Sequence, residues 1–239
     1  MKWIGGNKRT EERNTVPIAL IFDMDGTLFQ TDRILEISLQ ETFGYLKSLG
    51  EWASAAPIEK YREIMGVPLP VVWETLLPDH SNEIRHRAND YFHEKLLGNI
   101  ADGRGALYPH VIELFERLKQ AGCPIFIASN GQAEYLNAIV GYYRLDAWIA
   151  ETFSIQHIQS QNKADLVGHI LKKHRIEQAA VVGDRLSDIL AAKKNGLMAV
   201  GCRFDFAQEE ELMQADAVID DLLELTELFD LQPLGLHRS

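Results

Sequence analysis

The segment Ile18-Ala-Leu-Ile-Phe-Asp-Met-Asp-Gly-Thr-Leu28 joins an apolar run directly to two aspartates and a glycine. A short apolar run bounded by turn residues is typical of a buried parallel strand. In open α/β sheets, ligands bind just beyond the carboxyl ends of such strands. If the strand geometry extends that far, Asp23 and Asp25 project to the same side, and Gly26 permits a sharp turn after them.

Two carboxylates at this position can divide the work of phosphoryl transfer. One can attack phosphorus and form an aspartyl phosphate. The other can give a proton to the leaving oxygen and later take one from water. Since the two anions repel each other and an incoming phosphate, we expect a bound cation, and Mg²⁺ suits oxygen ligands. A plain Asp-rich turn is the alternative for any isolated Asp-x-Asp pair.

The full string Asp23-Met-Asp-Gly-Thr-Leu28 resembles the first motif of the haloacid dehalogenase-like hydrolases. Most members of that superfamily are Mg²⁺-dependent phosphatases. The resemblance implies a Rossmann-like α/β core with a doubly wound parallel sheet. It also implies a small helical cap, inserted after the first motif in many of these phosphatases, that closes over the site and selects the substrate.

Composition limits the possible partners and the compartment. A net charge of −11 over 239 residues argues against nucleic acid or an anionic membrane as the main partner. Two cysteines, Cys123 and Cys202, are too few for a disulfide framework, so we expect a reducing, cytoplasmic location. No run approaches the roughly 20 apolar residues of a transmembrane helix. Residues 1–16 are polar and are expected to form a flexible extension.

Residues 31–104, which we call the helical segment, show apolar residues at helical spacing and no strand pattern. The expected helices are Thr31–Leu49, Ile58–Met65, Leu69–Leu77 and one that Ser81 caps and that ends near Leu97, before Gly98. We assign residues 31–104 to a cap domain, and residues 17–30 and 105–239 to the core domain. The loop Met65-Gly-Val-Pro68 resembles the specificity loop of such caps, and three arginines there could meet a substrate anion: Arg62, Arg85 and Arg87.

Strands and helices alternate after the helical segment, which favours a parallel, doubly wound sheet. The expected strands are Pro124–Ser129, Trp148–Phe153, Ala179–Gly183, Met198–Cys202 and Ala217–Ile219. The expected helices are His110–Ala121, Ala133–Val140, Ala164–His174, Asp188–Asn195 and Leu222–Phe229.

Three further groups of polar residues follow these strands or begin these helices. Ser129-Asn130-Gly131 can grip phosphate oxygens, although it also suits an ordinary turn. Asp184 and Asp188 in Gly183-Asp-Arg-Leu-Ser-Asp188 could both face a metal ion, or could simply favour a helix N-terminus. Lys163 could neutralise the carboxylates. We expect Arg185 to hold a neighbouring carboxylate.

The resemblance assigns roles to these residues. It implies that Asp23 is the nucleophile, that Asp25 is the general acid and base, and that Thr27 helps to hold Asp25 and counts among the phosphate-binding residues. It implies phosphoryl-group binding by Ser129, Asn130 and Lys163. The implied Mg²⁺ ligands are Asp23, Asp25 (through its carbonyl), Asp184 and Asp188, the last of which binds the ion directly or holds a metal-bound water. Because the family pattern often has Lys-Pro where this chain has Lys163-Ala164, Lys172 and Lys173 are alternatives for the cation.

The expected function is Mg²⁺-dependent hydrolysis of a small phosphorylated metabolite: phosphoglycolate, a sugar phosphate or a nucleoside monophosphate. Dehalogenases and phosphonate hydrolases lack the acid–base aspartate, so Asp25 argues against both. A sugar phosphomutase with the same cap type remains an alternative. A non-catalytic binding or regulatory module is another, although it has no physical need for clustered, repelling carboxylates. The oligomeric state cannot be inferred from the sequence.

Overall fold

The computed structural model describes residues 18–64, 67, 69–205 and 207–231. Within these residues one six-stranded sheet has the order β3-β2-β1-β4-β5-β6, and each pair of neighbours is parallel. The strands are β1 (Ala19–Phe22), β2 (Ile125–Ser129), β3 (Ile149–Ser154), β4 (Ala179–Gly183), β5 (Met198–Cys202) and β6 (Ala217–Ile219). The predicted doubly wound parallel sheet is confirmed, and the strand order reverses between β1 and β4.

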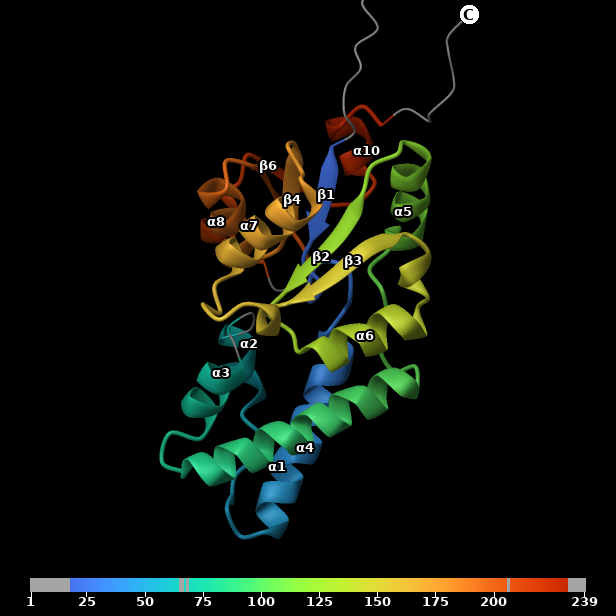
Figure 1. The fold of residues 1–239 in the computed structure, drawn as a ribbon. Helices are drawn as coiled ribbons and strands as arrows, with labels where there is room; N and C mark the ends of the chain where they lie inside the picture. The colour runs from blue at the N-terminus through green and yellow to red at the C-terminus, as the bar shows by residue number, and fades with distance from the viewer. Residues whose placement is uncertain (1–17, 65–66, 68, 206, 232–239) are drawn as a thin grey trace, which may run out of the picture.

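Helices cover both faces of the sheet (Figure 1). One face carries α5 (Val111–Gln120), α6 (Ala133–Tyr142) and α10 (Glu224–Leu228), and the other carries α7 (Lys163–His174), α8 (Leu186–Lys194) and α9 (Glu209–Leu212). Short 3-10 turns lie at Leu145–Ala147 and Ile155–His157. Phe22 of β1 packs on Phe115 of α5 with ring centroids 5.6 Å apart. Its neighbour Ile21 belongs to the apolar cluster on the opposite face, which explains why the strand is apolar throughout.

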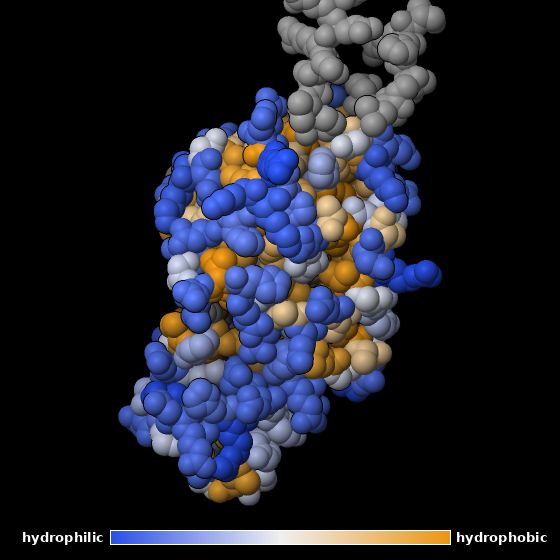
Figure 2. All heavy atoms as spheres, in the orientation of Figure 1, coloured by the Kyte–Doolittle hydropathy of each residue, from blue (hydrophilic) through white to orange (hydrophobic). Residues whose placement is uncertain are grey.

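The helical segment consists of α1 (Asp32–Ser48), α2 (Ile58–Glu63), α3 (Leu69–Leu76) and α4 (Asn82–Ala101). These helices gather below the sheet in Figure 1. Ser81 caps α4 as predicted, since its hydroxyl accepts a hydrogen bond from the Ile84 amide at 3.3 Å. The outer face seen in Figure 2 is mostly hydrophilic over this segment. The predicted extension 1–16 and most of the loop 65–68 lie outside the described residues.

The prediction that α4 ends before Gly98 is wrong, because the helix continues to Ala101. Two residues of the extra turn are buried, and Asn99 donates a hydrogen bond to Ser38 Oγ of α1 at 2.8 Å. The chain turns instead at Gly103, where φ is 70°. Packing against α1 therefore outweighs the unfavourable helix propensity of Gly98.

The two connections between the helical segment and the sheet are hydrogen-bonded to each other. The Gln30 amide donates to Ala106 O at 2.8 Å, and the Tyr108 amide donates to Leu28 O at 2.9 Å. Phe29 and Leu107 form an antiparallel bridge between them. The chain therefore leaves the sheet and returns to it through one short two-stranded ribbon.

No helix in the described part of the chain is long and apolar enough to cross a membrane. Cys123 and Cys202 are both buried free thiols.

Candidate active site

Three carboxylates meet where β1 and β4 end, at the point where the strand order reverses. Asp23 follows β1, Asp184 follows β4, and Asp188 lies in the first turn of α8, which begins two residues earlier than predicted. One oxygen from each carboxylate lies within 4.8 Å of the others, and all three residues are buried. We call this group the carboxylate cluster. The sequence motifs far apart in the chain thus form one site.

Two glycines provide the space for this cluster. Gly26 has a φ of +73°, and a Cβ there would overlap the Asp184 carboxylate. A Cβ at Gly183 would overlap the side chain of Asp188, although the backbone conformation there does not require glycine. A close approach of side chain to backbone explains both glycines, and at Gly26 the left-handed backbone adds a second reason.

Lys163 is the cation of the cluster. Its Nζ lies 2.8 Å from Asp23 Oδ1 and 2.5 Å from Asp188 Oδ1, and its side chain is only 4% exposed. Burial lowers the pKa of the ammonium, but the carboxylates of Asp188 and Asp23 outweigh it and leave the pKa above its ordinary value. The alternative Lys173 lies on the surface and pairs with Glu151. Lys163, and not Lys173, therefore contacts the carboxylate cluster.

The cluster carries more negative than positive charge, since three buried carboxylates face one ammonium. Burial raises the pKa of Asp23, and it raises that of Asp184 well above the usual range. Burial also raises the pKa of Asp188 to about 6, although Lys163 acts in the opposite direction. Each carboxylate is thus costly to ionise in the protein alone. A divalent cation with oxygen ligands fits this donor set, because it would neutralise the excess charge.

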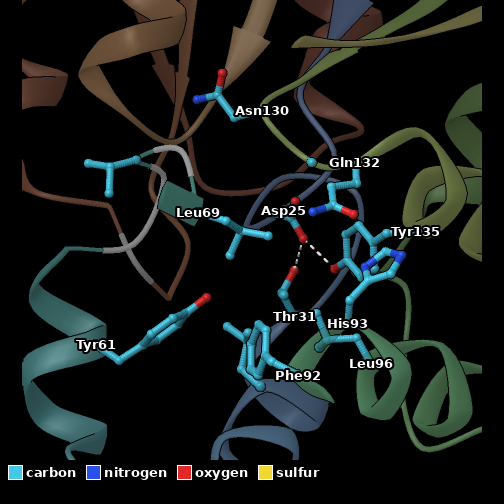
Figure 3. A pocket seen from close by; sticks show the side chains of 13 residues that line it. Asp25, Thr31, Tyr61, Leu69, Phe92, His93, Leu96, Asn130, Gln132 and Tyr135 are labelled. Atoms are coloured by element: carbon cyan, nitrogen blue, oxygen red, sulfur yellow. Dashed lines mark hydrogen bonds between the residues drawn. The ribbon is translucent and has the colours of Figure 1, made fainter. Parts of the chain in front are cut away.

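Asp25 lies beside the cluster and has its own hydroxyl partners. Thr31 Oγ1 donates to Asp25 Oδ1 at 2.6 Å, and the Tyr135 hydroxyl donates to the same oxygen at 2.5 Å (Figure 3). Burial raises the pKa of Asp25, whereas the hydrogen bonds from Thr31, Tyr135 and Ser129 lower it. Asp25 lies in the turn after β1, and the two hydroxyl donors hold its carboxyl group in place there.

The prediction that Thr27 holds Asp25 is wrong. Thr27 Oγ1 donates to Asp184 Oδ1 at 3.1 Å and is fully buried. The chain reverses within the turn after Asp25, and Thr31, six residues after Asp25, reaches the Asp25 carboxylate instead. Tyr135 was not predicted at all, because its helical position in the sequence is that of an ordinary core residue.

The loop after β2 lies at the edge of the same site. Ser129 is buried, and its Oγ accepts a hydrogen bond from the Gly131 amide at 3.0 Å. Ser154 Oγ donates to Gly131 O at 2.6 Å, so the neighbouring strand β3 also holds the loop. Asn130 and Gly131 line the pocket beside Asp25. The loop is thus a fixed turn with polar groups next to the acid–base candidate.

A pocket of about 570 Å³, part of it open to solvent, separates this site from the helical segment. Asp25, Asn130 and Gly131 line it from the side of the sheet, and Figure 3 shows Tyr61, Leu69 and Phe92 around the same space. The Tyr61 hydroxyl points into the pocket in that view. Residues of the sheet edge and of the helical segment therefore enclose one space.

Arg185 acts as predicted, because its Nε lies 3.1 Å from Glu211 Oε2. The three arginines of the helical segment that were expected to meet a substrate anion bind groups of that same segment instead. Arg62 pairs with Glu59 and Glu36, Arg85 donates to the carbonyls of Leu77 and Pro78, and Arg87 pairs with Glu83. None of these arginines lines the pocket beside Asp25 among the residues described there.

A model of the haloacid dehalogenase-like hydrolases matches residues 19–196. The match includes β1, the whole helical segment, the loop after β2, Lys163 and the two aspartates after β4. The chain belongs to the haloacid dehalogenase-like hydrolase family.

Three individual relatives have low sequence identity to this chain, between 20% and 27%. A phosphoglycolate phosphatase from Agrobacterium fabrum is 27% identical over 222 residues, which cover 88% of this chain and 91% of the relative. A 5'-nucleotidase from Pseudomonas aeruginosa is 22% identical over 203 residues, covering 81% and 86%. A solved structure of a predicted phosphoglycolate phosphatase from Haemophilus somnus has a TM-score of 0.78 at 20% identity, covering 89% of this chain and 97% of the other. That likeness supports the fold.

Proposed function

We propose that this hydrolase is a Mg²⁺-dependent phosphatase that cleaves a small phosphate monoester through an aspartyl phosphate on Asp23. The observation that carries the proposal is the carboxylate cluster with its single buried ammonium, Lys163, next to the hydrogen-bonded Asp25. The family match and the relatives named phosphoglycolate phosphatase and 5'-nucleotidase support hydrolysis of phosphate monoesters.

We assign nucleophilic attack to an Asp23 oxygen, because Asp23 lies at the end of β1 with Lys163 beside it to balance its charge. Asp25 gives its proton to the departing oxygen and then takes one from the water that cleaves the aspartyl phosphate. Its hydroxyl partners keep that carboxyl aimed at the pocket, where the leaving group lies. Ser129, Asn130 and Lys163 bind the transferring phosphoryl group.

Asp23, Asp184 and Asp188, with the backbone carbonyl of Asp25, would hold Mg²⁺. The ion would supply charge neutralisation for the phosphoryl oxygens. Thr27 contributes by fixing one oxygen of Asp184. Most of the rate gain is then expected from positioning and from neutralising charge.

We also propose that the helical segment is a cap domain, inserted between residues 30 and 105 of a core domain. It supplies one side of the pocket and excludes water from the reaction. The substrate is a small phosphorylated metabolite rather than nucleic acid, and the buried free thiols suit a reducing cytoplasm.

The experiment is phosphate release from a panel of small phosphate esters, with Mg²⁺ and with a chelator. The panel contains phosphoglycolate, hexose phosphates and nucleoside monophosphates. We expect release that stops with the chelator and resumes when Mg²⁺ is added back. Conversion of a hexose 1-phosphate to the 6-phosphate without release would indicate a mutase instead. No turnover of either kind would contradict the proposal and favour a binding module.

A further inference from the structure

We infer that the alcohol released by this enzyme is uncharged and largely apolar, so that substrates with a second anionic group are disfavoured. The inference rests on the proposed phosphatase function and concerns the part of the substrate beyond the phosphoryl group. It is drawn from the side chains that line the pocket beside Asp25.

Apolar and aromatic side chains form most of the pocket lining. The main contributors are Leu35, Tyr61, Leu69, Phe92, Leu96 and Tyr135. They come from α1, α2, α3 and α4 of the helical segment and from α6 of the core. Such a lining favours ligand binding, because apolar surface of the ligand is removed from water. The two tyrosine rings also offer flat contact area.

The charge of the lining is negative or neutral. No lysine or arginine is among the described residues around the pocket. The carboxylate of Asp25 lines it, and the only residue there that could become cationic is His93. His93 Nε2 already lies 3.3 Å from Glu134 Oε2, so a second carboxylate stands next to the one ring that could meet an anion. Met65, Gly66 and Pro68, which lie outside the described residues, have no ionisable side chains.

A neighbouring hollow shares Leu69 and Gln132 with this pocket and contains Arg85. The guanidinium donates to Leu77 O at 3.0 Å, to Pro78 O at 2.8 Å and to Asn82 Oδ1 at 3.2 Å. Its nitrogen atoms therefore already have acceptors within the helical segment. Reaching a substrate anion would require breaking these bonds.

An anionic leaving group would therefore lose its hydration in this pocket without gaining a cation, and would face Asp25. A neutral group of the same size would lose only apolar hydration. Phosphoglycolate carries a carboxylate and a bisphosphate carries a second phosphate, so both are expected to be poor substrates. Esters of neutral alcohols with an apolar or flat surface are expected to be good ones.

The test compares two substrates that match in size and shape: 4-carbamoylphenyl phosphate, which has a neutral amide, and 4-carboxyphenyl phosphate, which has an anion. We expect kcat/KM to be about tenfold or more higher for the amide, since one unpaired charge in a pocket commonly has an effect of that size. Both reactions should require Mg²⁺. Phosphoglycolate against propyl phosphate repeats the comparison with aliphatic esters.

The Leu69→Lys variant provides the second arm, because it places an ammonium in the pocket wall. We expect it to reduce or reverse the preference for the amide substrate. The matched control is Val71→Lys, at a residue of the same helix that is 45% exposed and does not line the pocket. This control should keep the wild-type preference.

Equal or faster turnover of the carboxylate by the wild-type protein would overturn the inference while leaving the phosphatase proposal intact. A preference that Leu69→Lys and Val71→Lys change equally would also overturn it, because the effect would then come from overall charge. Absence of Mg²⁺-dependent release from every ester would instead contradict the proposed function.

Discussion

The carboxylate cluster and the lining of the pocket beside Asp25, here called the pocket wall, lie side by side, yet they are built in opposite ways. The cluster is formed by short segments that follow β1 and β4, and one oxygen from each of its three carboxyl groups lies within 4.8 Å of the others. The pocket wall is formed mainly by helices and consists mostly of apolar side chains. In the cluster, a small displacement of one atom changes the chemistry. In the wall, size and charge matter more than exact position. The two regions should therefore respond differently to substitution.

The largest effect is expected from Asp23→Asn in the cluster. The amide keeps the size of the side chain but removes the proposed nucleophile, so kcat should fall by about 10³-fold or more. Phosphate release under saturating substrate measures it, and circular dichroism checks the fold. Asp146→Asn, at an exposed residue, is the matched control and should keep full activity. A near wild-type rate for Asp23→Asn would remove Asp23 from the proposed role.

Gly183→Ala tests whether the cluster depends on atomic spacing. The added Cβ would overlap Asp188, so that carboxylate must move, and we expect a loss of about 10²-fold in kcat. Gly98→Ala is the control in a helix, where a Cβ meets nothing within 4 Å. That change should keep activity and raise stability by about 0.5–1 kcal/mol in urea unfolding. If the two variants were equally active, the cluster would tolerate more displacement than we infer.

Tyr135→Phe concerns the boundary between the two regions, because Tyr135 lines the pocket and also bonds to Asp25. The change keeps the ring that forms the wall and removes one hydroxyl donor. We expect kcat to fall about tenfold while KM for a neutral aryl phosphate changes little. Tyr142→Phe, at an exposed tyrosine, should leave both constants unchanged. A rise in KM alone would show that the Tyr135 hydroxyl contributes to substrate binding in the pocket rather than to the positioning of Asp25.

The smallest effect is expected outside both regions, at Glu151. Its bonds to Lys173, and also to His174, lower the pKa of this glutamate. The stabilisation is therefore present above the unfolded-state pKa and is lost as the pH falls through the lower folded-state pKa. Glu151→Gln should lower stability at pH 7 by less than about 1 kcal/mol, since the pair is partly exposed.

Urea unfolding at pH 7 and in acid measures this effect, with Glu177→Gln as the exposed control. The difference between Glu151→Gln and the wild type should disappear in acid, below the folded-state pKa of Glu151. Phosphatase activity at pH 7 should remain unchanged. A difference that persists or grows in acid would contradict the expected direction of this pH dependence.

The sequence predicted the sheet and the family well, because both depend on local signals. Apolar runs that end in Asp or Ser mark strand ends directly, and the confirmed strands β4, β5 and β6 match their predicted bounds. The structure also brings Asp23, Asp184, Asp188 and Lys163 together. Their catalytic roles stay predictions.

Long-range contacts were the part that the sequence could not supply. Thr31 was expected only as the start of a helix, and Tyr135 only as part of one, because their bonds to Asp25 depend on how the chain turns and packs. The extra turn of α4 has the same cause, since the burial of Asn99 against α1 is not a local signal. The short helix α9, over Glu209–Leu212, was not predicted because three consecutive glutamates show no apolar periodicity.

The paired ribbon formed by residues 28–30 and 106–108 has a consequence for the evolution of this chain. Because the two ends of the helical segment meet there, a longer, shorter or different insert could be exchanged without changing the strand order. The core could thus keep one hydrolytic chemistry while successive inserts change which substrates it accepts. A chimaera that joins a relative's insert to this ribbon is therefore expected to fold with the sheet unchanged and to inherit the donor's substrate preference.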